Sequence, residues 1–229
     1  MLSIHKGFAD RTANDYNEDR VRLPSCVPKR CGRFVSDSVI TESEAKHMLS
    51  VAKRGLSLGG GSGGYSGLNL YTGVLSMATN RVNIYKLIER TQRKEEELKE
   101  LFTEKELEVY RTVTNRIHKR IAIHFGISWA QLYLTYPAVF LRYTANSAQT
   151  KRDVYWRRHL DKRDIKFVHF SSLLYLSTYG TDFSFGRFVF ADEILNTTIE
   201  PKLGRVVAYT SGSENEHFVD SHVWDPICA

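Results

Sequence analysis

The stretch RVVAYTSGSENEH, residues 205–217, decides the fold because it joins an expected β-strand to a candidate metal ligand. Its first eight residues follow the turn PKLG at 201–204. Similar short β-rich runs, separated by turns, recur from Leu132 onward: FLRY at 140–143, SLLYLS at 172–177 and GRFVF at 186–190. This pattern predicts an antiparallel sandwich of jelly-roll type.

His159 and Asp161 stand two positions apart in the tripeptide HLD. In extended backbone, side chains alternate with a period of two, so both are expected on the same side, where they can hold one ion. A third ligand must then come from a distant strand, and His217 fits. Two imidazoles and one carboxylate are the ligand set of non-haem Fe(II) oxygenases. The alternative is a solvated surface, because HLD recurs by chance and is flanked here by arginine and lysine.

Two other histidines compete with His217 as the third ligand. His169 falls inside an expected strand, and His222 follows His217 by five residues, which places it on the opposite face of a regular strand. We therefore prefer His217.

The order of these runs, with YWRRHLD at 155–161 before SLLYLS and the 205–217 stretch near the end, resembles the prolyl 4-hydroxylase-like 2-oxoglutarate and Fe(II)-dependent oxygenases. The segments CVPKRCGR at 26–33 and GLSLGG at 55–60 are similar to the region preceding the oxygenase domain in one member. The resemblance runs from about Cys26 to Trp224. It implies a double-stranded β-helix with supporting amino-terminal helices, an α+β fold.

The resemblance also implies a catalytic mechanism and a set of cofactors. His159, Asp161 and His217 would be catalytic and would bind Fe(II), with 2-oxoglutarate as co-substrate and L-ascorbate keeping the iron reduced. Tyr143 matches a family tyrosine whose hydroxyl faces the co-substrate; the alternative is a core aromatic with a solvated hydroxyl. The expected reaction is hydroxylation of a C–H bond in a protein or peptide substrate.

The end of the sequence departs from the family pattern. No arginine or lysine follows Arg205, so the basic residue that anchors the far carboxylate of 2-oxoglutarate has no matching position. The last strand of the fold is expected to be missing. Two alternatives to an active enzyme therefore stay open: an inactive truncated form, and a non-enzymatic jelly-roll module that binds a protein or glycan.

Family members are expected to carry an amino-terminal membrane anchor and to face the secretory lumen. This sequence begins with charges every few residues and has no apolar run long enough for a membrane span, so as written we expect it to be soluble. In an oxidising lumen Cys26 and Cys31 would form a disulfide; otherwise they are free thiols. Cys228 has no evident partner. Asn196 begins a glycosylation sequon that matters only in the lumen.

Composition agrees with a folded protein, since 229 residues that are 42% hydrophobic can bury a sizeable core. The net charge of +6 does not indicate nucleic-acid binding, because basic residues are mixed with acids and no RNA-binding or zinc-finger motif occurs.

Three regions are expected along the chain. Residues 1–35 form an irregular segment, 36–130 a helical region with a glycine-rich loop, and 131–229 the oxygenase domain. Within the second, we expect a helix over 41–52 capped by Thr41, a mobile linker over 59–67 that lacks the ending of a P-loop, and two helices over 82–125. Apolar residues supply the helical stripe: Leu87, Leu98, Leu101, Leu107, Tyr110, Val113, Ile117 and Ile121.

Overall fold

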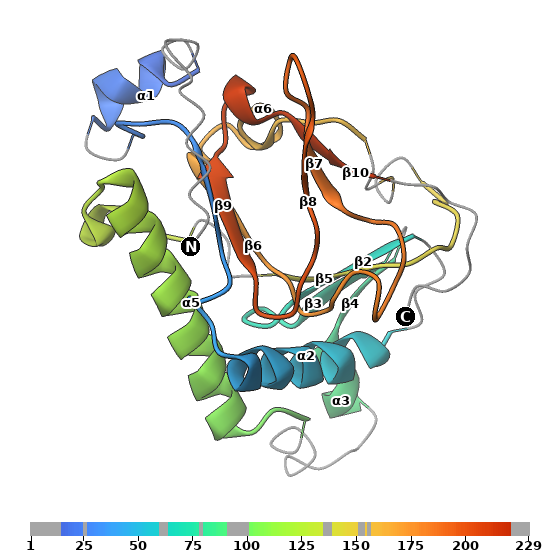
Figure 1. Cartoon of the computed structure of the whole chain (residues 1–229). Coiled ribbons are helices and arrows are strands. Elements are labelled where there is room, and N and C mark those ends of the chain that lie inside the picture. The colour runs from blue at the N-terminus through green and yellow to red at the C-terminus, as the bar shows by residue number, and fades with distance from the viewer. Residues whose placement is uncertain are drawn as a thin grey trace.

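The structure, a computed structural model, confirms the expected α+β class. It describes residues 15–24, 27–59, 64–77, 80–90, 101–134, 139–150, 154 and 157–220. Antiparallel sheets form a jelly-roll-like arrangement that does not close into a barrel, and helices cover one side of it (Figure 1).

Ten described strands form three antiparallel sheets. The first has the order β1 (Arg33–Ser36), β9 (Val206–Thr210) and β6 (Phe170–Leu174). The second has the order β10 (His217–Val219), β7 (Phe188–Phe190) and β8 (Thr197–Ile199). The third has the order β4 (Asn80–Asn83), β3 (Val74–Met77), β2 (Tyr65–Asn69) and β5 (Val139–Tyr143).

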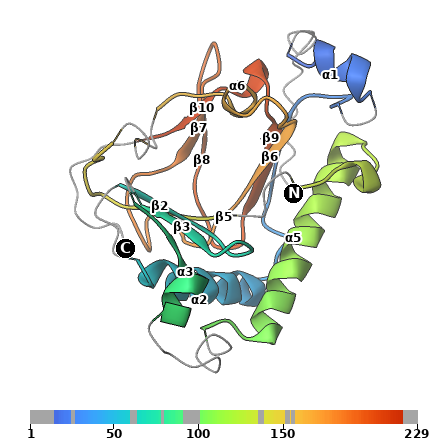
Figure 2. The ribbon, with the colours of Figure 1, turned by 180° about the vertical axis from the view of Figure 1, so that it is seen from behind.

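Two long helices, α2 (Glu42–Ser57) and α5 (Glu104–Phe125), pack on each other and against the sheets, as seen from behind in Figure 2. Thr41 and Thr103 begin them with capping boxes, in which the threonine hydroxyl and a glutamate three residues on satisfy free backbone groups. The expected helix over 41–52 is confirmed and extends to Ser57.

The remaining helical elements are short. They are α1 (Asn17–Arg22), α3 (Ile84–Arg90), α6 (Asp161–Asp164) and the 3-10 turns η2 (Trp129–Gln131) and η3 (Ser213–Asn215). Among the described residues, no helix has both the length and the apolar composition that crossing a bilayer requires.

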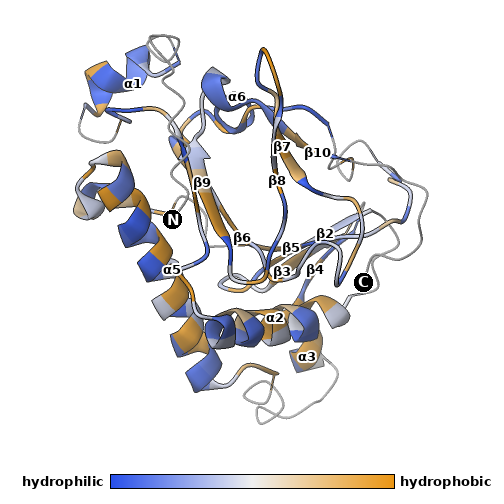
Figure 3. Ribbon diagram, viewed as in Figure 1, coloured by the Kyte–Doolittle hydropathy of each residue, from blue (hydrophilic) through white to orange (hydrophobic). Residues whose placement is uncertain are grey.

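The main core lies between the helices and the sheets, where Leu68 of β2 and Val113 of α5 are fully buried. Apolar residues follow β6, β9 and the helices that face them (Figure 3). A side chain at Gly55 of α2 would overlap Leu68, so glycine lets this helix approach the sheet closely. A second cluster, formed by Phe188, Phe190, Ile199, Val207 and Tyr209, joins β7 and β8 to β9.

The glycine-rich segment differs from the sequence expectation. We expected a mobile linker over 59–67, but 65–67 belong to β2, whose residues pair with β3 and β5. A side chain at Gly67 would lie 3.0 Å from the Tyr65 hydroxyl and 3.3 Å from Leu141, so this glycine permits close packing rather than mobility. Residues 60–63 lie outside the described part.

The expected helices over 82–125 also need correction. Val82 lies in strand β4, and α3 begins at Ile84. Leu87 is 38% exposed, because α3 instead buries Ile84 and Ile88. The stripe over 101–121 does face the core, and Leu98 lies outside the described residues. The sequence also failed to indicate β1 to β4. The three-part division of the chain stays a prediction, although β1 pairs with β9 and β2 with β5 across its boundaries.

An ion pair ties the end of β1 to the start of β9. Asp37 accepts hydrogen bonds from Arg205 at 2.7 and 2.9 Å and from Lys202 at 3.0 Å. The hydrogen bond from Arg205, helped by Lys202, lowers the pKa of Asp37 from 3.8 to about 2. A carboxylate with a depressed pKa in the folded state stabilises the protein above its unfolded pKa, and this contribution is lost as the pH falls through the folded value.

We expect Asp37→Asn to lower the melting temperature at pH 7, with the difference from wild type vanishing as the pH falls from about 4 to about 2. Thermal unfolding of the metal-free protein at a series of pH values measures this. Asp164→Asn, at an exposed site beside its own neighbour Arg163, is the matched control. A melting difference that stays constant with pH would contradict the assignment.

Candidate metal centre

His159 and His217 are direct cross-strand partners, although 58 positions separate them in the sequence. The His159 amide donates to the His217 carbonyl at 3.0 Å, and the His217 amide donates to the His159 carbonyl at 3.1 Å. Leu160 is extended, with φ −122° and ψ 123°, and Asp161 follows as the first residue of α6. The local backbone therefore returns Asp161 to the side of His159, as the HLD spacing predicted.

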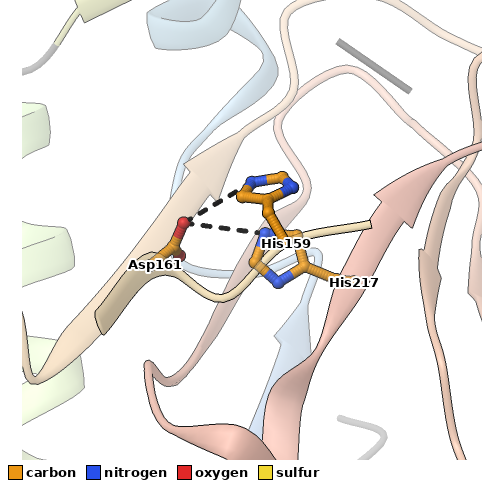
Figure 4. A group of neighbouring side chains, drawn as sticks. All are labelled: His159, Asp161 and His217. Carbon is orange, nitrogen blue, oxygen red and sulfur yellow. Dashed lines mark ion pairs between the residues drawn. The ribbon is translucent and has the colours of Figure 1, made fainter. Parts of the chain in front are cut away.

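The three side chains converge on one point. Oδ1 of Asp161 lies 3.7 Å from Nε2 of His159 and 3.7 Å from Nε2 of His217 (Figure 4). The three candidate ligand atoms lie within 4.8 Å of one another. Ligands that share one divalent ion at about 2.1 Å are about 3 Å apart, so small side-chain movements would complete the contacts. Two imidazole nitrogens and one carboxylate oxygen suit Fe(II).

Backbone carbonyls orient both imidazole rings. Nδ1 of His159 lies 2.9 Å from the Arg157 carbonyl oxygen, and Nδ1 of His217 lies 2.8 Å from the Asn215 carbonyl oxygen. Because a carbonyl oxygen only accepts, each Nδ1 must carry the proton and donate it. In a neutral ring with this tautomer the lone pair lies on Nε2, the atom that faces Asp161, and this is the arrangement that a metal ligand needs.

The two histidines differ in burial. His217 is 3% exposed and stacks on Phe188 with ring centroids 4.9 Å apart. Burial lowers the pKa of His217, opposed by the nearby charge of Asp161, so its imidazole is neutral at physiological pH. The side chains of His159 and Asp161 are 29% and 22% exposed, so one side of the triad is open to solvent.

Tyr209 of β9 also reaches the triad, and sequence reasoning missed it. Its hydroxyl lies 2.9 Å from Oδ2 of Asp161 and 3.3 Å from Nε2 of His217. Burial, followed by the charge of Asp161, raises the pKa of this hydroxyl well above its usual value. The sequence signal that could have indicated this residue was strand alternation. Val207 and Tyr209 are two positions apart, so both lie on the same face of β9.

Tyr143, the candidate co-substrate residue, ends β5 and is 40% exposed. Its ring stacks on Tyr65 with centroids 6.0 Å apart. Burial, and next the proximity of Tyr143, raise the pKa of Tyr175. The buried Tyr175 hydroxyl has no hydrogen-bond partner among the described residues. A bound ligand is one explanation for a buried polar group without a partner. Tyr175 is therefore, with Tyr143, a candidate co-substrate residue.

Other sequence candidates lie elsewhere or outside the described residues. His169 is not part of the triad; its Nε2 lies 3.1 Å from Asp19. His222, Cys26 and Cys228 fall outside the described part, so the disulfide stays a prediction. Asn196 is exposed just before β8, and its glycosylation also stays a prediction.

Arg33 of β1 supports the turn that precedes His217. Its buried guanidinium pairs with Asp192 at 2.7 Å, donates to the Glu214 carbonyl at 3.1 Å and also hydrogen-bonds Asn215. It lies 3.7 Å over the ring centre of Phe190. A planar guanidinium satisfies several acceptors at once, which fixes the turn.

The segment before and within α1 contacts both segments that carry the triad. Asp19 pairs with Lys162, the residue after Asp161, at 2.5 Å, and also contacts His169. Asp15 accepts from the Ser213 amide at 2.7 Å, and the fully buried Tyr16 donates to Glu214 at 3.2 Å. Residues near position 20 therefore help to hold elements 140 to 200 positions away.

Comparison with curated proteins identifies relatives over most of this sequence. It is 42% identical over 212 residues to the mouse (Mus musculus) protein named "2-oxoglutarate and iron-dependent oxygenase domain-containing protein 3". The human and Xenopus tropicalis proteins of that name are each 43% identical over 212 residues. The match covers 93% of this chain, and 65%, 64% and 65% of the mouse, human and Xenopus proteins.

These relatives are named for a 2-oxoglutarate and iron-dependent oxygenase domain, which is the class of oxygenase that the sequence motifs indicated. No family model matches the chain. The chain spans just under two thirds of the length of the curated relatives it matches. Their names state an iron and 2-oxoglutarate dependence, which agrees with the ligand set of the triad.

The ion pair between Asp19 and Lys162 provides a test of the amino-terminal contacts. The Lys162 side chain is 10% exposed and that of Asp19 is 25% exposed. We expect Asp19→Ala to lower the free energy of unfolding by about 2 kcal/mol, because the largely buried Lys162 ammonium loses its only charged partner among the described residues and keeps the Lys166 carbonyl and the Tyr16 ring. Urea unfolding of the metal-free protein measures the loss.

Glu18→Ala is the matched control, since the adjacent Glu18 is exposed. It should change the free energy of unfolding by less than about 0.5 kcal/mol. Equal stability of the two variants would show that α1 does not hold the segment beginning at Asp161.

Proposed function

We propose that this protein, a homologue of the 2-oxoglutarate and iron-dependent oxygenase domain-containing proteins, is itself an Fe(II)- and 2-oxoglutarate-dependent oxygenase. One observation carries the proposal: two histidines and one aspartate from distant segments direct Nε2, Nε2 and Oδ1 toward a common point. The names of the relatives support the same chemistry.

In this proposal His159, Asp161 and His217 hold Fe(II) through one face. The bound iron would supply the oxidation of a C–H bond, coupled to conversion of 2-oxoglutarate to succinate. The protein would orient the metal ligands, exclude water from one side of the ion and leave access on the other. The carbonyls of Arg157 and Asn215 fix the two rings, the aromatic cluster around His217 excludes water on one side, and the exposed edges of His159 and Asp161 leave access on the other.

We place the co-substrate near Tyr143 and Tyr175. The buried Tyr175 hydroxyl has a donor and lone pairs with no partner among the described residues, which suits a carboxylate ligand. Tyr143 lies close enough to affect the pKa of Tyr175, so the two belong to one region. A hydroxyl is a neutral donor, so this region differs from the basic anchor typical of the family.

The finer aspects of the function rest on the family resemblance. We propose a protein or peptide substrate in which one residue is hydroxylated at a C–H bond, as in prolyl 4-hydroxylase-like enzymes, with L-ascorbate maintaining the iron in the reduced state. By the same resemblance the full-length protein would be membrane-anchored and face the secretory lumen. Nucleic acid is not a proposed partner.

The test is formation of succinate from 2-oxoglutarate by the purified protein with Fe(II), ascorbate and oxygen. We expect measurable turnover, and a loss of at least about 100-fold in His159→Ala and in Asp161→Ala, because a metal supplies several kcal/mol and each 1.4 kcal/mol is tenfold. His47→Ala on α2 removes a histidine outside the triad and should retain activity.

Turnover that survives in His159→Ala would contradict the proposal. Metal binding without any succinate formation would instead support the inactive form. Absence of metal binding by a folded wild-type protein would support the non-enzymatic interaction module.

A further inference from the structure

Tyr209 brings a fourth polar group to the triad from the centre of a sheet. Its strand β9 is hydrogen-bonded on both sides, with Tyr209 opposite Arg33 of β1 and opposite Ser171 of β6. The residue is 2% exposed. Its ring centroid lies 5.7 Å from that of Phe188, 5.2 Å from that of Phe190 and 5.1 Å from that of His217. The backbone and the ring packing therefore fix the position of the hydroxyl.

The Tyr209 hydroxyl hydrogen-bonds Ser171 on the neighbouring strand and also reaches two acceptors of the triad. Oδ2 of Asp161 lies at 2.9 Å and Nε2 of His217 at 3.3 Å. A carboxylate is the stronger acceptor because it is charged, and it is also the closer one. Tyr209 therefore donates to Asp161, and the lone pair on Nε2 of His217 stays available.

This hydrogen bond makes the two oxygens of Asp161 inequivalent. Oδ2 is held by Tyr209, whereas Oδ1 faces Nε2 of both histidines at 3.7 Å. Carboxylates bind metals through one oxygen or through two. A carboxylate that uses both oxygens occupies one more position on the ion, which an oxygenase must keep open for its substrates.

We propose that Tyr209 is a positioning residue that restricts Asp161 to one metal-binding oxygen, Oδ1, and so preserves open positions on the ion. The inference deepens the proposed function and rests on it. A phenylalanine would fill the same buried space, so packing alone does not require a hydroxyl at position 209. The inference gives that hydroxyl a role.

The competing explanation is structural. A buried hydroxyl needs a hydrogen-bond partner, and Asp161 is simply the nearest acceptor. In that case loss of the hydroxyl would change the stability of the protein but not the way in which it binds a metal. The two explanations therefore differ in a metal-binding measurement on the isolated protein, without any substrate.

The test compares Tyr209→Phe with wild type, using Co(II) alone as the probe. Circular dichroism first establishes that the variant folds, which we expect because its neighbours Phe188 and Phe190 are already phenylalanines. Calorimetric titration then gives the affinity, and the visible absorption of bound Co(II) reports its coordination. We expect Co(II) affinity to fall about 10-fold in Tyr209→Phe, the lower end of the effect of groups that orient metal ligands. We also expect a changed spectrum, as Asp161 gains freedom to bind through both oxygens.

Tyr85→Phe on α3 is the matched control. It also removes one hydrogen-bonded hydroxyl from a partly buried tyrosine, but that hydroxyl donates to the Leu70 carbonyl and lies outside the triad. It should leave the affinity for Co(II) and the Co(II) spectrum unchanged.

A second comparison uses Asp161→Glu, whose longer side chain displaces the carboxylate from the hydroxyl. In that background, Tyr209→Phe should have little further effect on Co(II) affinity. The effects of substitutions at two interacting residues are not additive. An equal loss in both backgrounds would contradict the inference, as would an unchanged Co(II) spectrum in Tyr209→Phe. Failure of folded wild type to bind Co(II) would contradict the proposed function instead.

Discussion

The candidate site depends on one reciprocal pair of backbone hydrogen bonds, between His159 and His217. The two bonds, at 3.0 and 3.1 Å, bring together segments that are 58 positions apart in the sequence and place both imidazoles on the same side. The extended residue Leu160 then adds Asp161 to the pair. Because the backbone sets this geometry, the rest of the fold acts mainly by keeping these two segments in register.

Several contacts between residues far apart in the sequence hold these two segments in register. Arg33, buried on β1, fixes the turn before His217, while Asp19 and Tyr16 near the amino terminus contact Lys162 and Glu214 on the two sides of the triad. Tyr209 acts from the central strand of the first sheet. Each of these groups is charged or polar and largely buried, so each requires its specific partner. Stability and site geometry therefore depend on the same interactions.

The sequence predicted the features that follow from local periodicity. The alternation in HLD, the choice of His217 over His169 and the cap at Thr41 required only strand and helix geometry. Strands β1 and β2 were missed because β1 pairs with β9 and β2 with β5, which lie far along the chain and which no local pattern reveals. Strands β3 and β4 pair with each other, and β3 also pairs with β2, so they were missed together with β2. Gly67 was read as mobile for the same reason. Tyr209 and Asp19 act through contacts across the fold, and Tyr175 is notable only for a hydroxyl without a described partner.

We infer that the triad forms an iron site with open positions for 2-oxoglutarate. This is tested by adding Fe(II) and then 2-oxoglutarate to the purified protein without oxygen and recording its visible absorption. We expect a charge-transfer band that appears only when both are present and is absent in His159→Ala. Binding of Fe(II) to the wild-type protein without such a band, at saturating 2-oxoglutarate, would contradict the inference.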